Sequence, residues 1–242
     1  SDLHLSIQSP PVVRVHGELT RLDQPALTPA DTKTLAYSVL TDAQKKRFEE
    51  TQELDFSFGI RGLARFRCNM FNQKGAVGAV YRLIPERVRP FDELGLPPVI
   101  GKLAERARGL VLVTGPTGSG KSTTLAAMID KINIERKGHI LTIEDPIEYL
   151  YEHRRSIVNQ REIGIDTQTY QLALQNALRE APDLIMIGEI RDKETMQSAL
   201  LHTLTGHLCL TTIHANNSYH ALSRIINLFP YDARSAVLSD LS

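Results

Sequence analysis

The fold of this chain is decided by an apolar run, Gly109-Leu-Val-Leu-Val-Thr114, and by the segment that follows at once, Gly115-Pro-Thr-Gly-Ser-Gly-Lys-Ser122. A continuous apolar run predicts a strand buried on both faces of a parallel sheet. The second segment matches G-x-x-x-x-G-K-[ST] and precedes a predicted helix over 121–136, the context in which this pattern binds phosphate. Its glycines let consecutive backbone N–H groups turn toward phosphate oxygens, and the helix amino terminus adds its dipole. The sequence therefore predicts a nucleotide-binding loop.

Two side chains of this loop have defined roles in nucleotide chemistry. Lys121 would reach the β and γ phosphates and Ser122 would be a ligand of Mg²⁺, so ATP and Mg²⁺ are the expected cofactors. The alternative is a glycine-rich turn with an accidental lysine, which rarely stands between a buried strand and a helix. The predicted nucleotide-binding residues are Gly115, Pro116, Thr117, Gly118, Ser119, Gly120, Lys121, Ser122 and Thr123.

After the loop, short apolar strands alternate with helices. Strands are expected over 139–143, 183–187 and 208–213, and helices over 169–180 and 192–204. This alternation predicts an α/β fold with right-handed crossovers. A ligand would lie at the carboxyl ends of the strands.

Acidic residues follow two of these predicted strands. Glu144 follows the strand that begins at 139, and Glu189 follows the strand that begins at 183. Glu144 is the candidate for polarising the attacking water, and Glu189 for holding Mg²⁺ through its water shell. Asp145 and Glu148 are weaker candidates. An acidic loop start before Pro146 is the alternative for Glu144.

Two histidines, His207 and His214, flank the strand expected over 208–213. At opposite ends of one strand they cannot share a metal ion. His214 lies at the ligand side, where it could sense the γ-phosphate. A lone histidine is more often a satisfied polar group, and His207 is expected to be structural.

The first ninety residues predict a small α+β domain. Strands are expected over 2–7, in a hairpin over 12–19, and over 54–60, 64–71 and 76–83. Short helices should begin at the N-cap signals of Thr28 and Thr41. Four prolines between positions 85 and 98 favour an extended connector. The predicted division is 1–88 for the first domain, 89–98 for the linker and 99–242 for the nucleotide-binding core.

Arg67 and Arg82 belong to the first domain and cannot reach the phosphate loop along their own strands. Basic residues on a small sheet are usually solvated. They could act on the γ-phosphate only if the domains close or a neighbouring subunit presents them.

The composition of the chain argues against several classes of protein. The 242 residues hold 28 Lys plus Arg and 28 Asp plus Glu, so contact with nucleic acid or anionic lipid must be local. Two cysteines without a CxxC pattern argue against a disulfide framework or a zinc ribbon. No apolar stretch is long enough to span a bilayer. We expect a cytosolic protein that binds no nucleic acid.

Several long motifs, in order and along nearly the whole chain, resemble the PilT-type ATPases of the type IV pilus, within the secretion ATPase superfamily. They are Ser1–Leu5, Pro10–Val15, Ser57–Gly62, Gly115–Thr124, Ile143–Tyr149, Asn159–Glu162, Gly188–Asp192 and Thr205–His207. The resemblance implies a PAS-like first domain joined by a linker to a RecA-like P-loop ATPase core, assembled as a hexamer.

The resemblance also assigns roles to residues. It implies that Glu144 is the catalytic glutamate of an acidic "Asp box", that Glu189 is the Walker B glutamate, and that 207–214 form a "His box". It makes Arg67 and Arg82 contacts of the γ-phosphate. The implied catalytic set is Glu144, Glu189, Lys121, His214, Arg67 and Arg82.

The implied function is ATP hydrolysis coupled to domain closure, driving pilus retraction and twitching motility. Extension-type relatives carry four zinc-binding cysteines that this chain lacks, which favours retraction over assembly. Three alternatives stay open. The chain could be an accessory nucleotide-binding subunit, because Ile190, 207–210 and 214–217 look more like PilU-type paralogues. It could be a related secretion or DNA-transport ATPase, or, more distantly, a small-molecule kinase.

The implied partners are further copies of the chain, an inner-membrane platform protein and a paralogous ATPase. The implied location is the cytoplasmic face of the bacterial inner membrane. Family sequences extend beyond the positions of Ser1 and Ser242, so we expect the chain to be a fragment.

Overall fold

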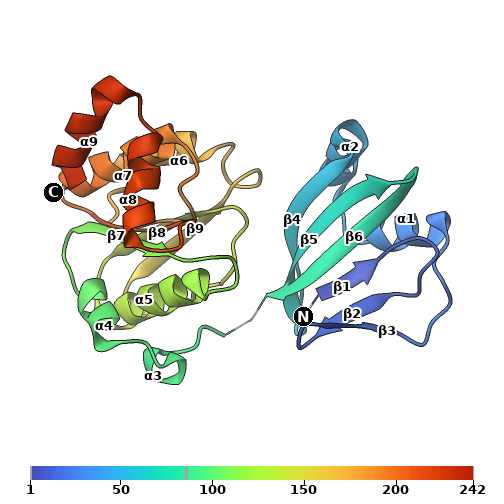
Figure 1. Cartoon of the computed structure of the whole chain (residues 1–242). Coiled ribbons are helices and arrows are strands. Elements are labelled where there is room, and N and C mark those ends of the chain that lie inside the picture. Colours follow the sequence, from blue (N-terminus) through green and yellow to red (C-terminus); the bar gives the residue numbers. More distant parts are fainter. Residues whose placement is uncertain (1, 85–86, 242) are drawn as a thin grey trace. The chain divides into compact units, whose positions relative to one another are not determined.

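The computed structural model describes residues 2–84 and 87–241, and the chain separates into two compact units, Ser1–Glu86 and Arg87–Ser242 (Figure 1). Each unit has its own sheet and its own hydrophobic core. In the part of the chain that the structure describes, no helix is long and apolar enough to cross a membrane.

The first unit is built on a six-stranded antiparallel sheet in the order β3-β2-β1-β6-β5-β4. Its helices begin where the sequence predicts, at reciprocal capping contacts of Thr28 with Asp31 and of Thr41 with Gln44. The elements are β1 (Asp2–Leu5), β2 (Val12–Val15), β3 (Glu18–Arg21), α1 (Pro29–Tyr37), α2 (Asp42–Thr51), β4 (Glu53–Ile60), β5 (Ala64–Gln73) and β6 (Ala76–Ile84).

Alternation along these strands separates a core face from a polar face. Cys68 and Met70 on β5 and Tyr81 on β6 are buried in one cluster with Phe48 of α2. Burial of such side chains supplies the main drive for folding of this unit. Arg67 and the other intervening side chains therefore lie on the opposite face.

The second unit is built on a five-stranded, all-parallel sheet in the order β7-β11-β10-β8-β9. Its elements are α3 (Phe91–Leu94), α4 (Pro98–Ala104), β7 (Gly109–Thr114), α5 (Lys121–Glu135), β8 (His139–Glu144), β9 (Ile157–Glu162), α6 (Tyr170–Ala177), β10 (Leu184–Ile187), α7 (Lys193–Leu204), β11 (Leu208–Ile213), α8 (Ser218–Asn227) and α9 (Arg234–Leu241), with 3-10 turns at Leu178–Glu180 and Tyr231–Ala233.

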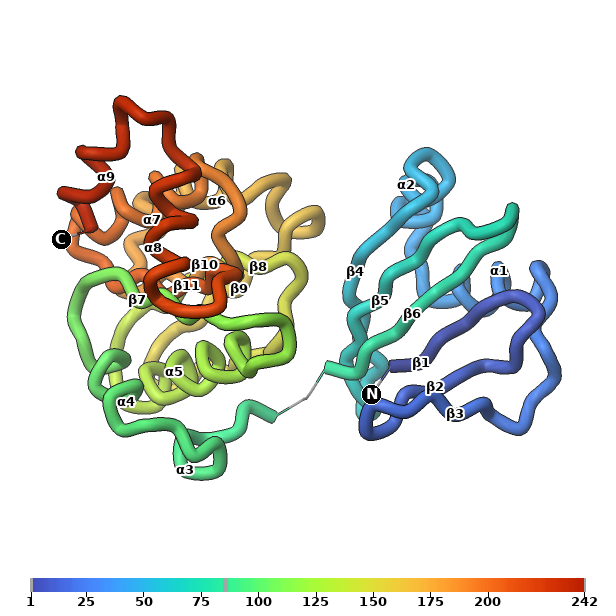
Figure 2. The backbone as a smooth tube through the Cα atoms, viewed as in Figure 1, coloured from blue at the N-terminus to red at the C-terminus, as the bar shows by residue number. Residues whose placement is uncertain are grey.

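Helices cover both faces of this parallel sheet (Figure 2). Met128 and Ile129 of α5 pack with Ile140 and Leu210 on one face. Leu174 of α6 packs with the opposite face of the same strands. The near-continuous apolar strands predicted this two-sided burial.

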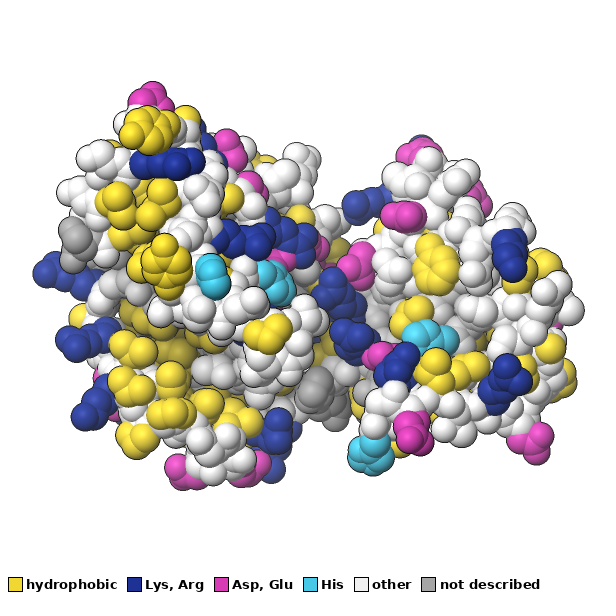
Figure 3. Space-filling model, viewed as in Figure 1, with side chains coloured by type: hydrophobic (Ala, Val, Ile, Leu, Met, Phe, Trp, Pro, Cys, Tyr) yellow, Lys and Arg dark blue, Asp and Glu magenta, His cyan; other side chains and the backbone are white. Residues whose placement is uncertain are grey.

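Hydrophobic side chains remain on the surface over α8 and α9 (Figure 3). Tyr219 and Leu222 of α8 are exposed, as are Tyr231 and Leu238 in the segment that follows.

The structure departs from the predicted elements in the connector and at one sheet edge. The segment expected to be extended contains α3, and α4 begins at Pro98; proline is tolerated in a first helical turn because it needs no N–H donor there. Strand β9 was not predicted, because Asn-Gln-Arg-Glu follows only two apolar residues. The helix expected over 169–180 ends at Ala177 and continues as a 3-10 turn.

Candidate active site

The glycine-rich loop connects β7 to α5 with a backbone that only glycine adopts easily. Gly120 has a φ of 90° and immediately precedes the first residue of α5. A Cβ on Gly115 would collide with Ser119 Oγ. The loop therefore passes close to its own side chains and presents the amino terminus of a 15-residue helix at its end. This arrangement fits a phosphate group.

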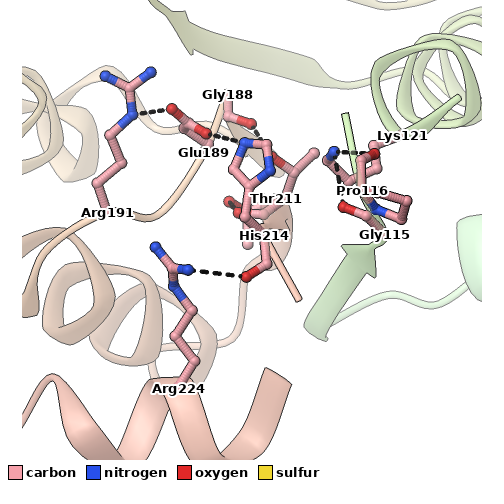
Figure 4. A network of polar contacts seen from close by, with 10 residues as sticks. Gly115, Pro116, Lys121, Gly188, Glu189, Arg191, Thr211, His214 and Arg224 are labelled. Carbon is pink, nitrogen blue, oxygen red and sulfur yellow. Dashed lines mark hydrogen bonds and ion pairs between the residues drawn. The ribbon is translucent and has the colours of Figure 1, made fainter. Parts of the chain in front are cut away.

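Lys121 is the first residue of α5 and folds back over the loop. Its Nζ donates to the carbonyl oxygens of Gly115 and Pro116, each at 3.0 Å. Figure 4 shows the ammonium directed toward the residues that follow β10 and β11. The positive charge thus lies where a bound phosphate would need it.

A second group of residues follows the neighbouring strands β10 and β11 (Figure 4). His214, directly after β11, donates from Nε2 to Glu189 Oε2 over 2.9 Å. The other oxygen of Glu189, Oε1, accepts from Arg191 Nε. Arg224 of α8 donates to the backbone oxygen of His214 over 3.1 Å. The Glu189 carboxylate is thereby fixed between two nitrogen donors.

Charge and burial both act on His214. Burial lowers the pKa of His214, and the positive charges of Lys121, Arg224 and Arg191 lower it further. The neutral imidazole is therefore favoured near pH 7. Its Nε2 carries the proton that Glu189 accepts, which leaves Nδ1 as an acceptor.

Glu144 ends β8 at the same edge of the sheet and is 5% exposed. Its Oε1 accepts from Thr142 Oγ1 at 2.8 Å and from Gln160 Nε2 at 3.3 Å. Its Oε2 accepts from the backbone N–H of Glu148 at 3.3 Å. The carboxylate is thus held in one orientation by three donors.

Polar contacts link Glu144 to the loop helix. Gln160 also donates to the carbonyl oxygen of Tyr149 over 2.7 Å. The hydroxyl of Tyr149 lies 3.2 Å from Thr123 Oγ1, in the first turn of α5. A continuous path therefore runs from the predicted nucleotide-binding loop through Tyr149 and Gln160 to the carboxylate.

Burial dominates the protonation of Glu144. It raises the pKa of Glu144 to about 7, although the hydrogen bonds from Thr142, Glu148 and Gln160 oppose the increase. A carboxylate with a pKa near the working pH is suited to accept a proton from water. A general base needs a group of this kind, so Glu144 stays a candidate for that role.

Tyr170, the first residue of α6, lies beside this group. Its hydroxyl is buried and, among the described residues, has no hydrogen-bond partner. A Cβ on Gly188 would lie 3.0 Å from that oxygen. Burial raises the pKa of Tyr170, and Asp145 raises it further, so the hydroxyl stays protonated.

Tyr170→Phe is expected to raise the free energy of unfolding by about 1 kcal/mol, because it removes a buried hydroxyl without a protein partner and keeps the ring. Urea unfolding at neutral pH measures the change. Thr142→Val is the comparison, since its hydroxyl donates to Glu144 and its loss should destabilise the protein. A destabilised Tyr170→Phe variant would show that the hydroxyl makes a stabilising contact.

Arg67 and Arg82 lie in the first unit, on neighbouring strands. They face each other directly across β5 and β6. Arg67 Nη2 donates to Asp55 Oδ2 over 2.7 Å, and Arg82 Nε donates to Asp2 Oδ1 over 2.9 Å. The Arg82 guanidinium beside Asp2 lowers the pKa of that carboxyl. Two like charges side by side on one face form a surface suited to an anion.

The structure brings some predicted site residues together and separates others. Lys121, Glu144, Glu189 and His214 all follow or end parallel strands, so they share one edge of the second unit's sheet. The two arginines belong to the other unit. His207, before β11, donates from Nδ1 to the His202 carbonyl oxygen over 3.0 Å, a local contact at the opposite end of the strand.

Sequence reasoning did not single out Gln160, Tyr170, Arg191 or Arg224. Gln160 was part of a family motif, and Arg191 part of another, but their contacts with Glu144 and Glu189 depend on strand pairing. Tyr170 and Arg224 stand on helices whose amphipathic pattern gives no sign of a polar contact at the sheet edge. The place of these four residues in the candidate site becomes visible only in the three-dimensional structure.

The donor set also bears on Mg²⁺. Across residues 2–84 and 87–241, no three His, Cys, Asp or Glu side chains converge as an all-protein metal site would require. Magnesium in nucleotide sites is usually bound by a hydroxyl or one carboxylate together with substrate phosphates. Ser122 at the start of α5 and Glu189 after β10 are compatible with that mode.

A parallel sheet with a phosphate loop and two acidic residues at its carboxyl edge defines a P-loop ATPase with a RecA-like core. The family model for "Type II/IV secretion system protein" matches residues 12–233, and the chain belongs to this family. The fold predicted from the sequence is confirmed, and so is the resemblance to PilT-type ATPases.

Two of the similar relatives and one similar crystal structure are named for pilus systems. The "Type IV pilus retractation ATPase PilT" of Pseudomonas aeruginosa is 49% identical over all of this chain and 70% of its own length. The "Type IV pilus ATPase PilU" of the same organism is 46% identical over all of this chain. This chain spans 63% of that PilU relative. The crystal structure of the "Pilus Retraction Motor PilT and Bound ADP" matches with a TM-score of 0.93 and 50% identity, over 100% of this chain and 71% of that one.

Proposed function

We propose that this chain is the ATPase of a pilus retraction motor, which hydrolyses ATP with Mg²⁺ in a homohexameric ring. The feature that carries the proposal is Glu144, a buried carboxylate with a pKa of about 7 that is linked by hydrogen bonds to the helix of the phosphate loop. Similarity to PilT over the whole chain supports the retraction role.

The residues of this chain divide the work of hydrolysis among them. Glu144 would take a proton from the attacking water, and Thr142 and Gln160 would keep its carboxylate aimed. The Lys121 ammonium would leave the Gly115 and Pro116 carbonyls for the β and γ phosphates. Neutral His214, held by Glu189, would offer Nδ1 as an acceptor to a donor such as water beside the γ-phosphate. Mg²⁺, held by Ser122 and through water by Glu189, would neutralise phosphate charge.

Coupling to movement would use residues 89–98 as a linker between residues 1–88 and the core of 99–242. Closure would bring Arg67 and Arg82 to the γ-phosphate, where they would exchange Asp55 and Asp2 for phosphate oxygens. Loss of the γ-phosphate would return them to the carboxylates. An inner-membrane platform protein would receive this motion at the cytoplasmic face of the membrane.

The proposal predicts that ATP turnover per chain rises with ring assembly and disappears when Mg²⁺ is chelated. Steady-state turnover, measured over a range of protein concentrations beside sedimentation of the same samples, tests this. Turnover that stays constant across the assembly range would contradict a site completed by a neighbouring subunit. Turnover that survives chelation would contradict the assignment of Mg²⁺.

The second candidate is a PilU-like accessory subunit, favoured by 46% identity to PilU beside 49% to PilT. It predicts nucleotide binding without turnover by the isolated protein, and turnover or motility only together with a paralogous ATPase. ADP titration of the isolated protein, added to the turnover assay, separates the two functions: both candidates bind nucleotide, and only the motor hydrolyses ATP by itself.

A further inference from the structure

The loop that carries His214 lies between two regular elements and belongs to neither. Strand β11 ends at Ile213 and helix α8 begins at Ser218, so residues 214–217 form a short loop. The last pair in the register between β11 and β7 is Ile213 with Thr114. Beyond that pair the sheet no longer fixes the backbone, and the position of His214 in the candidate active site depends on other contacts of loop 214–217.

Thr114, the last residue of β7, holds one carbonyl group of this loop. Its Oγ1 donates to the Ala215 carbonyl oxygen over 2.7 Å, in a partly buried contact. Gly115, the first residue of the phosphate loop, follows Thr114 directly in the chain. The Thr114 hydroxyl therefore joins loop 214–217 to the start of the phosphate loop.

Arg224 of α8 holds the preceding carbonyl group (Figure 4). Its Nη1 donates to the His214 carbonyl oxygen over 3.1 Å. Ala221 and Ile225 of the same helix are buried in the core of the second unit, so the helix that carries Arg224 has a fixed place. Two consecutive carbonyl groups of loop 214–217 are thus each held by a side chain, and the two side chains come from different elements.

A third contact fixes the imidazole of His214. Its Nε2 donates to Glu189 Oε2 over 2.9 Å. His214 is therefore held both at its backbone and at its ring. Such control matters in an active site, because a displacement of about 1 Å can lower a rate by on the order of a hundredfold.

We propose that Thr114 and Arg224 are positioning residues, which hold His214 beside the phosphate loop during ATP hydrolysis. The inference rests on the proposed function, in which neutral His214 acts near the γ-phosphate. Neither side chain needs to contact the nucleotide, because each acts through a carbonyl group of loop 214–217. Loss of either contact lets the His214 ring move relative to the phosphate loop.

Thr114→Val and Arg224→Gln test the proposal. The first keeps the shape of the side chain and removes the hydroxyl donor, and the second removes the guanidinium group. The kcat for ATP hydrolysis should fall about tenfold in Thr114→Val, whose contact is partly buried, and about fivefold in Arg224→Gln, whose contact is exposed. The KM for ATP should change by less than about twofold, because Lys121 and the phosphate loop are intact.

Two matched controls make the same changes where the accepting carbonyl group lies outside loop 214–217. Arg234 of α9 donates to the Phe229 carbonyl oxygen over 3.2 Å. Thr203 of α7 donates from Oγ1 to the Ala199 carbonyl oxygen over 2.9 Å. Arg234→Gln and Thr203→Val should keep the kcat of the unmodified protein. Equal losses of kcat in these controls would overturn the proposal.

The ring of His214 gives a readout that does not depend on turnover. Nitrogen NMR shifts at pH 8 show which ring nitrogen carries the proton, and His214→Gln assigns the signals. The unmodified protein should show a protonated Nε2, and both positioning variants a mixture of the two neutral tautomers.

The two readouts separate this inference from the proposed function. Unchanged kcat in both variants, or unchanged His214 ring signals in both, would overturn the positioning role and leave the proposed function standing. An unmodified protein that does not hydrolyse ATP would contradict the proposed function, and the ring signals would still decide whether Thr114 and Arg224 hold His214.

Discussion

Glu144→Gln is expected to lower kcat for ATP hydrolysis about a thousandfold, with little change in nucleotide affinity. The reason is that an amide keeps the shape of the side chain but has no lone pair basic enough to take the proton of the attacking water. Thr142 and Gln160 can still contact the Oε1 position, so the local structure should persist. Single-turnover hydrolysis beside ADP titration separates chemistry from binding.

The pH dependence of the unmodified protein follows from the same group. Because the pKa of Glu144 is raised to about 7, the base is protonated in acid, and kcat should fall below that pH. In the unfolded chain the carboxyl titrates near 4.5, so the folded state binds the proton more tightly. Stability contributed by Glu144 therefore declines as pH rises from about 4.5 to about 7, and above that range the buried charge costs up to about 3 kcal/mol.

The free energy of unfolding of Glu144→Gln shows whether a loss of turnover comes from lost catalysis or from a damaged fold. At pH 8, Glu144→Gln removes the buried negative charge, which stabilises the fold. It also replaces the oxygen that accepts the Glu148 N–H with an NH2 group, and loss of that hydrogen bond costs about 1 kcal/mol. Its free energy of unfolding should be unchanged or higher by up to about 2 kcal/mol. Glu148→Gln is the matched control and should keep its turnover. Full turnover by Glu144→Gln, or its loss in Glu148→Gln, would move the base to another residue.

Local sequence patterns were sufficient to predict the elements whose formation depends on residues close together in the chain. The buried strand, the glycine-rich loop and the helix after it depend on neighbouring residues, and β7, α5 and β11 have the expected positions within a residue. Edge strand β9 was not predicted, because four of its six residues are polar. In the described sheet it pairs only with β8, and a long loop separates the two strands in the sequence.

The candidate site likewise contains residues that the sequence predicts and contacts that only the fold creates. Lys121, Glu144, Glu189 and His214 could be predicted, because each stands directly at or after an apolar strand and parallel strands end at one edge. The contact of Gln160 with Glu144 could not be predicted, because it depends on the pairing of β8 with β9. The contact of Arg191 with Glu189 could not be predicted either, because it depends on the turn after β10. Spacing alone left Arg67 and Arg82 as surface charges.

The register of the first unit's sheet now gives those arginines a physical reason to bind an anion. Arg67 and Arg82 are direct neighbours across β5 and β6, and like charges in that position repel. Asp55 and Asp2 offset the repulsion from either side. Phosphate oxygens would replace both carboxylates at once and bring more negative charge to the pair.

Arg67→Gln together with Arg82→Gln is therefore expected to lower kcat about a thousandfold, the effect of losing cations that stabilise charge on a transferring phosphoryl group. Nucleotide affinity should change much less, because the loop and Lys121 are intact. The unfolding free energy should stay within about 1 kcal/mol, since removing two facing charges relieves repulsion while ending two exposed ion pairs. Arg14→Gln, on the same face and 3.9 Å from Asp2, is the control and should remain active.

Mixing two inactive proteins determines where the arginines act. The arginine variant has an intact phosphate loop, and Lys121→Ala has intact arginines. If a neighbouring subunit supplies Arg67 and Arg82, mixed rings contain sites with one good loop and one good arginine pair, and part of the turnover returns. If the arginines serve the loop of their own chain, every site lacks one component and the mixture stays inactive. Full activity of the arginine variant by itself would show that neither arginine takes part in hydrolysis.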